Sequence, residues 1–129
     1  MRAVDTNVVV RLLAKDHPEQ SARAFAVFGE AVTWVPVTVM LETEWVLRSA
    51  YRAEPRKIVA LFRSMFGIPG LAVENAAAVS QALDWFEQGM DFADALHLAT
   101  ARDCDGFATF DRDFIKTAAR LGAGRVAEP

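Results

Sequence analysis

Four acidic residues that lie far apart in the sequence are the strongest candidates for chemistry: Asp5, Glu42, Asp94 and Asp111. Carboxylates gathered in one cleft repel each other, and ionising them together is unfavourable unless a cation compensates. Because the set contains neither His nor Cys, its oxygen ligands favour a hard cation, Mg²⁺ or Mn²⁺, over zinc. Such an ion positions a water, lowers its pKa and neutralises charge at a phosphoryl group. Phosphodiester hydrolysis is the chemistry that suits this set.

The elements that must position these acids alternate along the chain. Hydrophobic periodicity and breaker residues predict four strands, at residues 2–5, 32–36, 71–73 and 106–109. The same patterns predict helices at about 7–14, 18–29, 38–51, 55–66, 75–88, 92–104 and 112–121, with Thr38 as the cap of the third. Strands that alternate with helices indicate parallel pairing and a layered α/β fold. A length of 129 residues predicts a single domain.

Three of the acids fall at junctions between a strand and a helix. Asp5 ends the first strand, Glu42 lies early in the helix after the second, and Asp111 follows the strand at 106–109. Asp94 lies in the first turn of the helix that begins near residue 92. Parallel sheets bind ligands at the carboxyl ends of their strands. We therefore expect the four acids to meet in one cleft.

A structural role is the alternative for each acid, because acidic residues also favour helix N-termini. Asp5 and Asp111 suit N-cap positions, and Asp91-Phe-Ala-Asp94 resembles a capping box. Glu42 suits the positive end of a helix dipole. Any one acid alone is more readily explained as a cap than as a metal ligand. Four acids on one sheet edge favour a site.

Composition narrows the class of protein. The net charge of −3 argues against a general nucleic-acid binder. Residues 48–63 nevertheless carry five bases and one acid, Glu54, and this segment suits either a phosphate backbone or a solvated helix face. Cys104 is the only cysteine, so no intrachain disulfide is expected. No apolar run is long enough to span a bilayer, and the first residues do not look like a signal peptide. We expect a cytoplasmic protein without membrane contact.

Four motifs occur in order around the acids, and a further segment supports them. They read Val4-Asp-Thr-Asn7, Val35-Pro-Val-Thr-Val-Met-Leu-Glu42, Asp91-Phe-Ala-Asp-Ala-Leu-His97 and Thr109-Phe-Asp-Arg-Asp-Phe114, and Glu44-Trp-Val-Leu-Arg48 follows the second. With these motifs the sequence resembles the PIN-domain family and, within it, the VapC-type toxins of toxin–antitoxin pairs, and the resemblance covers essentially the whole chain. Each short motif is weak by itself, whereas the ordered set is specific.

The resemblance implies a fold and an activity. The fold would be a PIN-like, three-layer α/β arrangement in which a short parallel central sheet is flanked by helices. The protein would be a homodimeric endoribonuclease with an acidic Mg²⁺ or Mn²⁺ site. Its partners would be an RNA substrate and a cognate VapB-type antitoxin whose tail blocks the acidic cleft.

The resemblance also suggests roles for single residues. Asp5 and Asp94 would be the main metal ligands, and Asp111 would bind metal through water or complete a second site. Glu42 is preferred over Glu44, which points to another helix face. The supporting residues implied by the motifs are Thr6, Asn7, Thr109 and Asp113. The two threonines would orient a water or a carboxylate, and Asn7 would hydrogen-bond Asp5. Asp113 is a lesser candidate for a metal ligand. Thr6, Asn7 and Thr109 are also typical of local caps and turns.

Several further residues suit either a functional or a structural role. His97 lies one turn after Asp94 and shares its helix face, although a histidine at the core edge is the simpler interpretation. The arginines that suit RNA-backbone contacts are Arg11, Arg48, Arg52 and Arg112. A solvated surface is the alternative for these arginines.

Other functions fit the sequence less well. A phosphatase of the haloacid-dehalogenase type needs a second Asp where this chain has Asn7. A receiver-like Mg²⁺-binding module needs an acidic pair in its first loop and a late Lys, whereas Lys116 lies inside the last predicted helix. An inactive PIN protein that only binds partners is the remaining alternative.

Overall fold

The computed structural model describes residues 1–129. The chain divides into two compact units, Met1–Ala76 and Ala77–Pro129, and each unit is described by itself. That these units form one domain remains a prediction.

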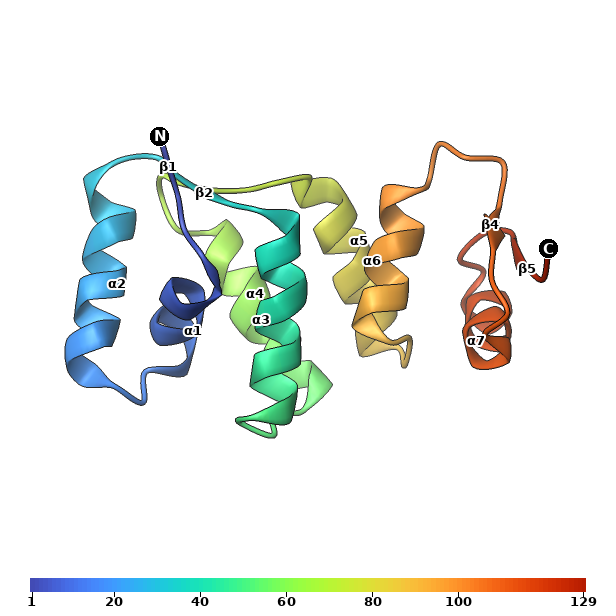
Figure 1. The fold of residues 1–129 in the computed structure, drawn as a ribbon, viewed down its shortest axis with the longest axis horizontal. Coiled ribbons are helices and arrows are strands. Elements are labelled where there is room, and N and C mark those ends of the chain that lie inside the picture. Colours follow the sequence, from blue (N-terminus) through green and yellow to red (C-terminus); the bar gives the residue numbers. More distant parts are fainter. The chain divides into compact units, whose positions relative to one another are not determined.

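The N-terminal unit contains a three-stranded parallel sheet and four helices (Figure 1). Its elements are β1 (Arg2–Ala3), α1 (Thr6–Ala14), α2 (Pro18–Glu30), β2 (Thr33–Val35), α3 (Val37–Ser49), α4 (Pro55–Phe66) and β3 (Leu71–Val73). The strand order is β1-β2-β3, and Ala3 and Ala72 are both partners of Trp34 in the central strand. Both pairings are parallel, so the predicted parallel α/β fold is confirmed.

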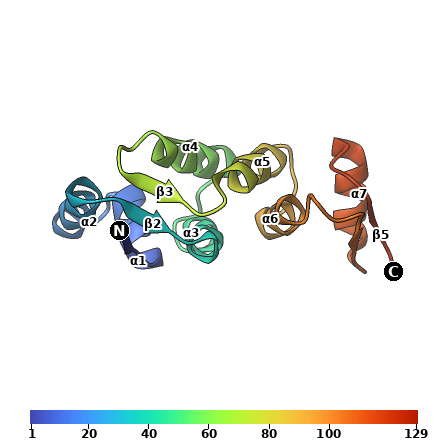
Figure 2. The ribbon, with the colours of Figure 1, turned by 90° about the horizontal axis from the view of Figure 1, so that it is seen from above.

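Helices cover both sides of this sheet. In Figure 2, β2 and β3 run between α4 on one side and α1 and α3 on the other. The stripe formed by Ile58, Phe62 and Met65 makes one face of α4 completely buried. Val9 of α1 and Met40 of α3 are equally inaccessible to solvent. The layers are therefore held together by apolar side chains that recur with the helical period.

The C-terminal unit contains three helices and a two-stranded parallel sheet. Its elements are α5 (Ala76–Glu87), α6 (Phe92–Thr100), β4 (Phe107–Ala108), α7 (Arg112–Leu121) and β5 (Val126–Ala127). Phe86 of α5 meets Phe92 of α6 edge to face, with ring centroids 5.5 Å apart. Phe107 of β4 packs on Phe114 of α7 at 5.3 Å. These aromatic contacts stabilise the connection between α5 and α6 and the connection between β4 and α7.

Four predicted features differ from the structure. The strand predicted at 106–109 does not join the sheet of β1, β2 and β3 but pairs with β5 in a second sheet, so Asp111 does not lie at the edge of the sheet that precedes Asp5. Thr38 is not the cap of α3: the helix starts one residue earlier, Pro36 occupies the N-cap position, and the Val37 N–H donates to Glu74 Oε1 at 2.8 Å. The helix predicted for 92–104 ends at Thr100, because the turn-forming residues that follow it favour a loop. Strand β5 was not predicted, because two residues are too few to show an alternating pattern.

None of the seven helices combines the length with the apolar character that a bilayer span requires.

Candidate functional site

Asp5 lies between β1 and α1, where it is the N-cap of the helix. Its Oδ1 accepts a hydrogen bond from the Val8 N–H at 3.4 Å. The capping interpretation is therefore correct for Asp5. The bond is long, and the residue stays exposed to solvent. A carboxylate in this position can cap the helix and still offer oxygen to a ligand from solution.

Glu42 is joined to the neighbour of Asp5 by a hydrogen bond between α1 and α3. The donor is the Thr6 hydroxyl and the acceptor is Glu42 Oε1. Thr6 is buried, whereas Glu42 is exposed. The bond fixes the Glu42 carboxylate beside the N-terminus of α1, so Asp5 and Glu42 lie in the same region of the N-terminal unit.

Glu44 has a different environment from Glu42, although it is only two residues away. Its carboxylate is buried and accepts from Arg48 Nε at 2.8 Å, one helical turn further on. A buried carboxylate that is already paired makes a poor ligand for an ion from solution. The structure thus gives a physical reason to prefer Glu42, and it shows that Arg48 has an intramolecular partner.

Asp94 lies in the first turn of α6, where the backbone N–H of Asp94 donates to Asp91 Oδ2 at 3.2 Å. Partial burial raises the pKa of the Asp94 carboxyl above its usual value, and the charges of Asp91 and Asp111 raise it further, whereas His97 lowers it. His97 is exposed, so it lies on the surface near Asp94 and not in the core. The ionised form of Asp94 is therefore less favoured than in water, and a nearby cation would offset this effect.

A small cavity of about 160 Å³ adjoins Asp94. Three acidic residues line it, Asp91, Asp94 and Asp113, together with Phe114 and Thr117. From the sequence, Asp91 was expected to be a cap only. Its place beside Asp94 in the third motif was the signal that could have marked it as a member of the acidic group.

Asp111 is the N-cap of α7. Its Oδ1 accepts from the Phe114 N–H at 3.1 Å, and its own N–H donates to the Thr109 hydroxyl at 3.0 Å. Thr109 therefore fixes the turn that presents Asp111, and its hydroxyl makes no hydrogen bond to another acid of the set. Asp111 is exposed, yet its charge reaches Asp94.

The acids thus form two groups. Asp5 and Glu42 belong to the N-terminal unit, and the C-terminal unit holds Asp94 and Asp111 together with Asp91 and Asp113. Neither group brings three His, Cys, Asp or Glu side chains into an arrangement that could hold a metal by itself. The donor chemistry suits a hard divalent cation, because every candidate ligand is a carboxylate. A bound cation would also offset the neighbouring negative charges that raise the pKa of Asp94. That both groups share one cleft remains a prediction.

Asn7 does not support Asp5 in the way that was expected. No hydrogen bond joins the two side chains, because Asn7 lies inside the first turn of α1 and lines a groove of about 330 Å³ between α1 and α2. His17 caps α2, a role that the sequence did not predict: its Nδ1 accepts from the Gln20 N–H at 3.4 Å.

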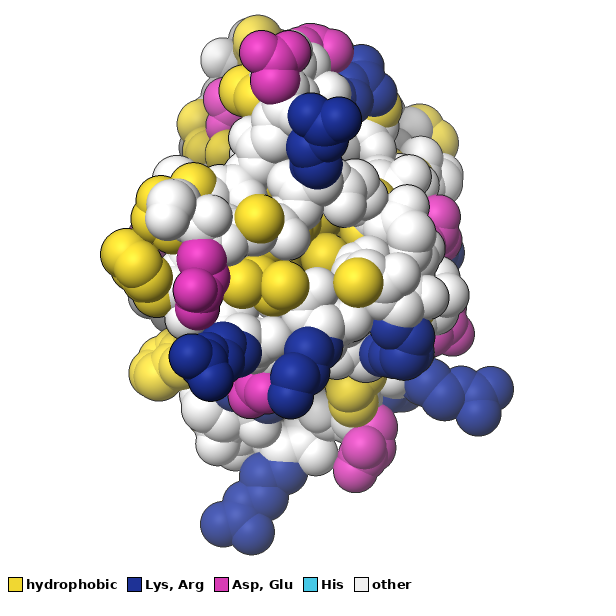
Figure 3. Space-filling model, turned by 90° about the vertical axis from the view of Figure 1, so that its right-hand side faces the viewer, with side chains coloured by type: hydrophobic (Ala, Val, Ile, Leu, Met, Phe, Trp, Pro, Cys, Tyr) yellow, Lys and Arg dark blue, Asp and Glu magenta, His cyan; other side chains and the backbone are white.

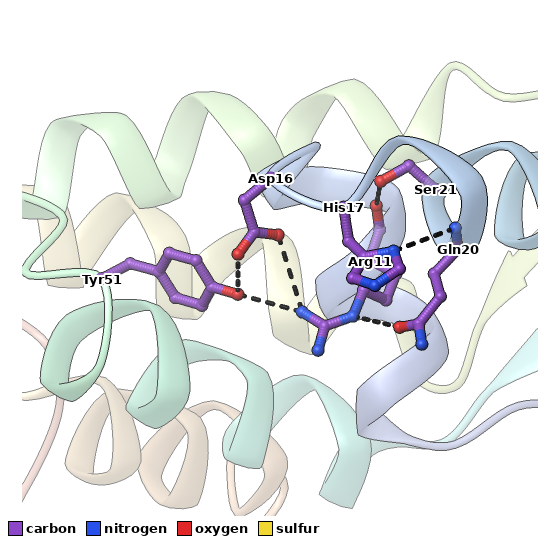
Figure 4. A network of polar contacts seen from close by, with 6 residues as sticks. All are labelled: Arg11, Asp16, His17, Gln20, Ser21 and Tyr51. Carbon is purple, nitrogen blue, oxygen red and sulfur yellow. Dashed lines mark hydrogen bonds and ion pairs between the residues drawn. The ribbon is translucent and has the colours of Figure 1, made fainter.

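Arg11 belongs to a polar network that ties α1 to the start of α2 and to Tyr51 after α3 (Figure 4). Its Nε donates to Gln20 Oε1 at 2.6 Å, and its Nη1 lies 3.1 Å from the Tyr51 hydroxyl and 3.6 Å from Asp16 Oδ1. The Tyr51 hydroxyl donates to Asp16 Oδ2 at 2.8 Å. This bond, aided by burial, raises the pKa of Tyr51, although Arg11 opposes the rise. Arg11 is thus already engaged within the protein.

The other arginines proposed for RNA contact lie at the surface. Arg52 is exposed and adopts a left-handed backbone conformation, with a φ of 53°. Arg112 follows Asp111 directly and forms an exposed ion pair with Glu128 at 3.6 Å.

The family model described as "PIN domain" matches residues 2–120. No curated protein matches the chain. Among solved structures, the chain is similar to the VapC20 toxin of Mycobacterium tuberculosis, which is described as cleaving the sarcin–ricin loop. The two are 23% identical, the match covers 90% of this chain and 94% of that one, and the TM-score is 0.44. Since the family model spans both units and all four motif acids, the chain belongs to the PIN-domain family.

Proposed function

We propose that this protein is a metal-dependent endoribonuclease and the toxin of a type II toxin–antitoxin pair. The observation that carries the proposal is the acidic group at the N-termini of α6 and α7. Here the half-buried Asp94 has a raised pKa because of burial and the charges of Asp91 and Asp111. Charge repulsion of this kind is expected where a cation is to be bound. Family membership supports the assignment to nucleases.

Asp5, Glu42, Asp94 and Asp111 would hold the ion, which we propose to be Mg²⁺ or Mn²⁺. When bound, it would supply positive charge for a scissile phosphate and lower the pKa of a water. The protein's own contribution is positional. Hydrogen bonds at the helix N-termini fix Asp5 and Asp111, and the Thr6 hydroxyl fixes Glu42. Thr109 acts one step further out, through the backbone N–H of Asp111. Ligands held in this way lose little conformational freedom when the ion binds.

The remaining parts of the proposal follow from the same family assignment. The substrate would be RNA, and a cognate VapB-type antitoxin would cover the acidic groups. The active protein would be a cytoplasmic homodimer. A small neighbouring reading frame that encodes a DNA-binding segment and an amphipathic tail would support the antitoxin partnership.

The direct test is cleavage of total tRNA and ribosomal RNA by the purified protein with Mg²⁺ or Mn²⁺. Cleavage is expected to stop with EDTA and in the Asp5→Asn and Asp94→Asn variants. Asp103→Asn, which alters an exposed acid in the loop after α6, is the matched control and should cleave like the parent. Cleavage that persists undiminished in both site variants would overturn the assignment of the site.

One observation favours a second candidate, a Mg²⁺-binding or inactive interaction module. Asp5, Asp91 and Asp111 each cap a helix, so part of the acidic pattern has a structural explanation. This candidate predicts metal binding, measured by calorimetry, without RNA cleavage. The cleavage experiment separates the two functions.

A further inference from the structure

Helix α7 carries a row of basic side chains that the proposed catalytic role does not use. Arg112, Lys116 and Arg120 are spaced four residues apart, so they lie along one face of the helix, and all three are exposed. The row is about 12 Å long at the helical rise of about 1.5 Å per residue. Figure 3 looks onto the end of the C-terminal unit that carries α7, and a row of Lys and Arg side chains crosses that face.

The acidic cavity lies on a different side of the helix from Arg112 and Lys116. Asp113 and Thr117 line that cavity together with Asp91 and Asp94, whereas Arg112 and Lys116 line a separate hollow beside β5. Consecutive helical residues are about 100° apart, so the chain order Arg112-Asp113 and Lys116-Thr117 separates the charges. Arg112 and Lys116 therefore lie away from the cavity, whereas Arg120, seven residues after Asp113, lies near the side of the helix that carries Asp113, the only acid of α7.

The basic face keeps donors for an external ligand. Lys116 makes no hydrogen bond or ion pair in the structure, and its side chain is exposed. Arg112 pairs with Glu128 at 3.6 Å, but 82% of its side chain is accessible, so solvent screens the pair. Arg120 donates to the Gln88 carbonyl oxygen at 3.0 Å through one nitrogen. A guanidinium has five N–H donors, so this bond leaves Arg120 further donors.

The position of the row relates it to the proposed site. Arg112 directly follows Asp111, so one end of the row lies at the acidic group and the other end lies about two turns away along α7. The acids by themselves repel a polyanion, and the chain as a whole has a net charge of −3. Binding of a phosphate backbone therefore needs a local source of positive charge next to the acids.

We propose that the basic face of α7, formed by Arg112, Lys116 and Arg120, binds the backbone phosphates of single-stranded RNA next to the point of cleavage. This inference rests on the proposed ribonuclease function and assigns its substrate-docking surface. The competing basic segment is residues 48–63, where Arg48 is paired with the buried Glu44. The contacts would be to phosphates and would give affinity without base specificity.

The test measures binding of a short, fluorescently labelled single-stranded RNA of mixed sequence by anisotropy, in EDTA to prevent cleavage, over a series of salt concentrations. Each phosphate neutralised by a basic side chain contributes about 0.7 to the magnitude of the slope of log K against log salt. Arg112→Gln and Lys116→Gln should each weaken binding several-fold and reduce the slope by about this amount, and the double variant by about 1.4. The matched controls, Arg56→Gln and Lys57→Gln on α4, should leave both quantities unchanged.

The outcomes separate this inference from the function on which it rests. A parent protein that neither cleaves nor binds RNA would refute the ribonuclease proposal itself. A parent that cleaves and binds RNA, with the same salt slope in the Arg112 and Lys116 variants, would refute only the docking surface. A loss of RNA affinity confined to the α4 variants would refute the α7 surface and assign RNA binding to residues 48–63. Variants that keep RNA binding but lose an acidic protein partner would assign the face to that partner instead. Unchanged thermal unfolding would establish that the variants are folded.

Discussion

Asp111 allows the capping role and the proposed catalytic role of one carboxylate to be measured separately. Asp111→Asn keeps a side-chain oxygen at the N-cap of α7, so the Phe114 N–H keeps its acceptor, but it removes the negative charge. Asp111→Ala removes both the acceptor and the charge. If the residue has two roles, the two substitutions should have the same effect on cleavage and different effects on stability.

The size of the stability effect follows from the cap geometry. The 3.1 Å bond from Phe114 is an ordinary hydrogen bond, and its loss at an N-cap costs about 1 kcal/mol of unfolding free energy. Phe114 itself is buried and packs on Phe107, so the helix start is anchored by apolar contacts as well. Asp111→Ala should therefore lower the melting temperature by roughly 3–6 °C for a chain of this length. Asp111→Asn should change it by less than about 1 °C, since Asn and Asp cap almost equally well.

Thermal unfolding and RNA cleavage should be measured on the same preparations, with and without Mg²⁺ or Mn²⁺. Both variants should lose about 10- to 100-fold in cleavage, the loss typical when an outer partner of a metal site is removed. Asp105→Asn, at an exposed position in the loop before β4, is the matched control for a charge change in the same unit. Full activity in Asp111→Asn would refute the catalytic role and leave Asp111 as a cap only. An equal loss of stability in Asn and Ala variants would refute the cap argument.

Three further predictions concern groups whose environments the structure defines. Without metal, Asp94→Asn should match or exceed the parent in thermal stability near neutral pH. The folded-state pKa of Asp94 is raised, so the stability that its protonated form contributes at low pH is lost as the pH rises through the folded pKa. Marked destabilisation of the variant would contradict this reasoning. Tyr51→Phe should lower the stability near neutral pH, and the stability of the variant should approach that of the parent at alkaline pH. Because the pKa of Tyr51 is raised, neutral Tyr51 stabilises the fold below its unfolded pKa of about 10. That contribution is lost as the pH rises through the folded pKa. Melting curves at several alkaline pH values test this, and a constant difference between the two proteins would refute it. Glu42→Gln should abolish RNA cleavage whereas Glu44→Gln should retain it, and the reverse result in the same assay would exchange their roles.

Element boundaries with strong local signals were predictable from the sequence. Pro55 begins α4 at its first helical position, as the sequence predicts. Asp111 and the left-handed Gly122 enclose α7, whose predicted range of 112–121 agrees with the structure. These signals act within one helical turn, so no distant residue is needed to interpret them. The N-terminus of α3 was not predictable in this way, because its acceptor is Glu74, which is 37 residues away in the chain.

The sequence alone determined which residue types were available, their order, and hence the family to which the chain belongs. It also determined the two faces of α7, because the helical period separates Arg112 and Lys116 from Asp113. The tertiary structure decided the environments of the carboxylates. Glu42 and Glu44 are chemically identical, and only packing buries Glu44 against Arg48 while Thr6 binds Glu42. Ionisation and ligand binding depend on burial and on neighbouring charges, and those neighbours are brought together by folding.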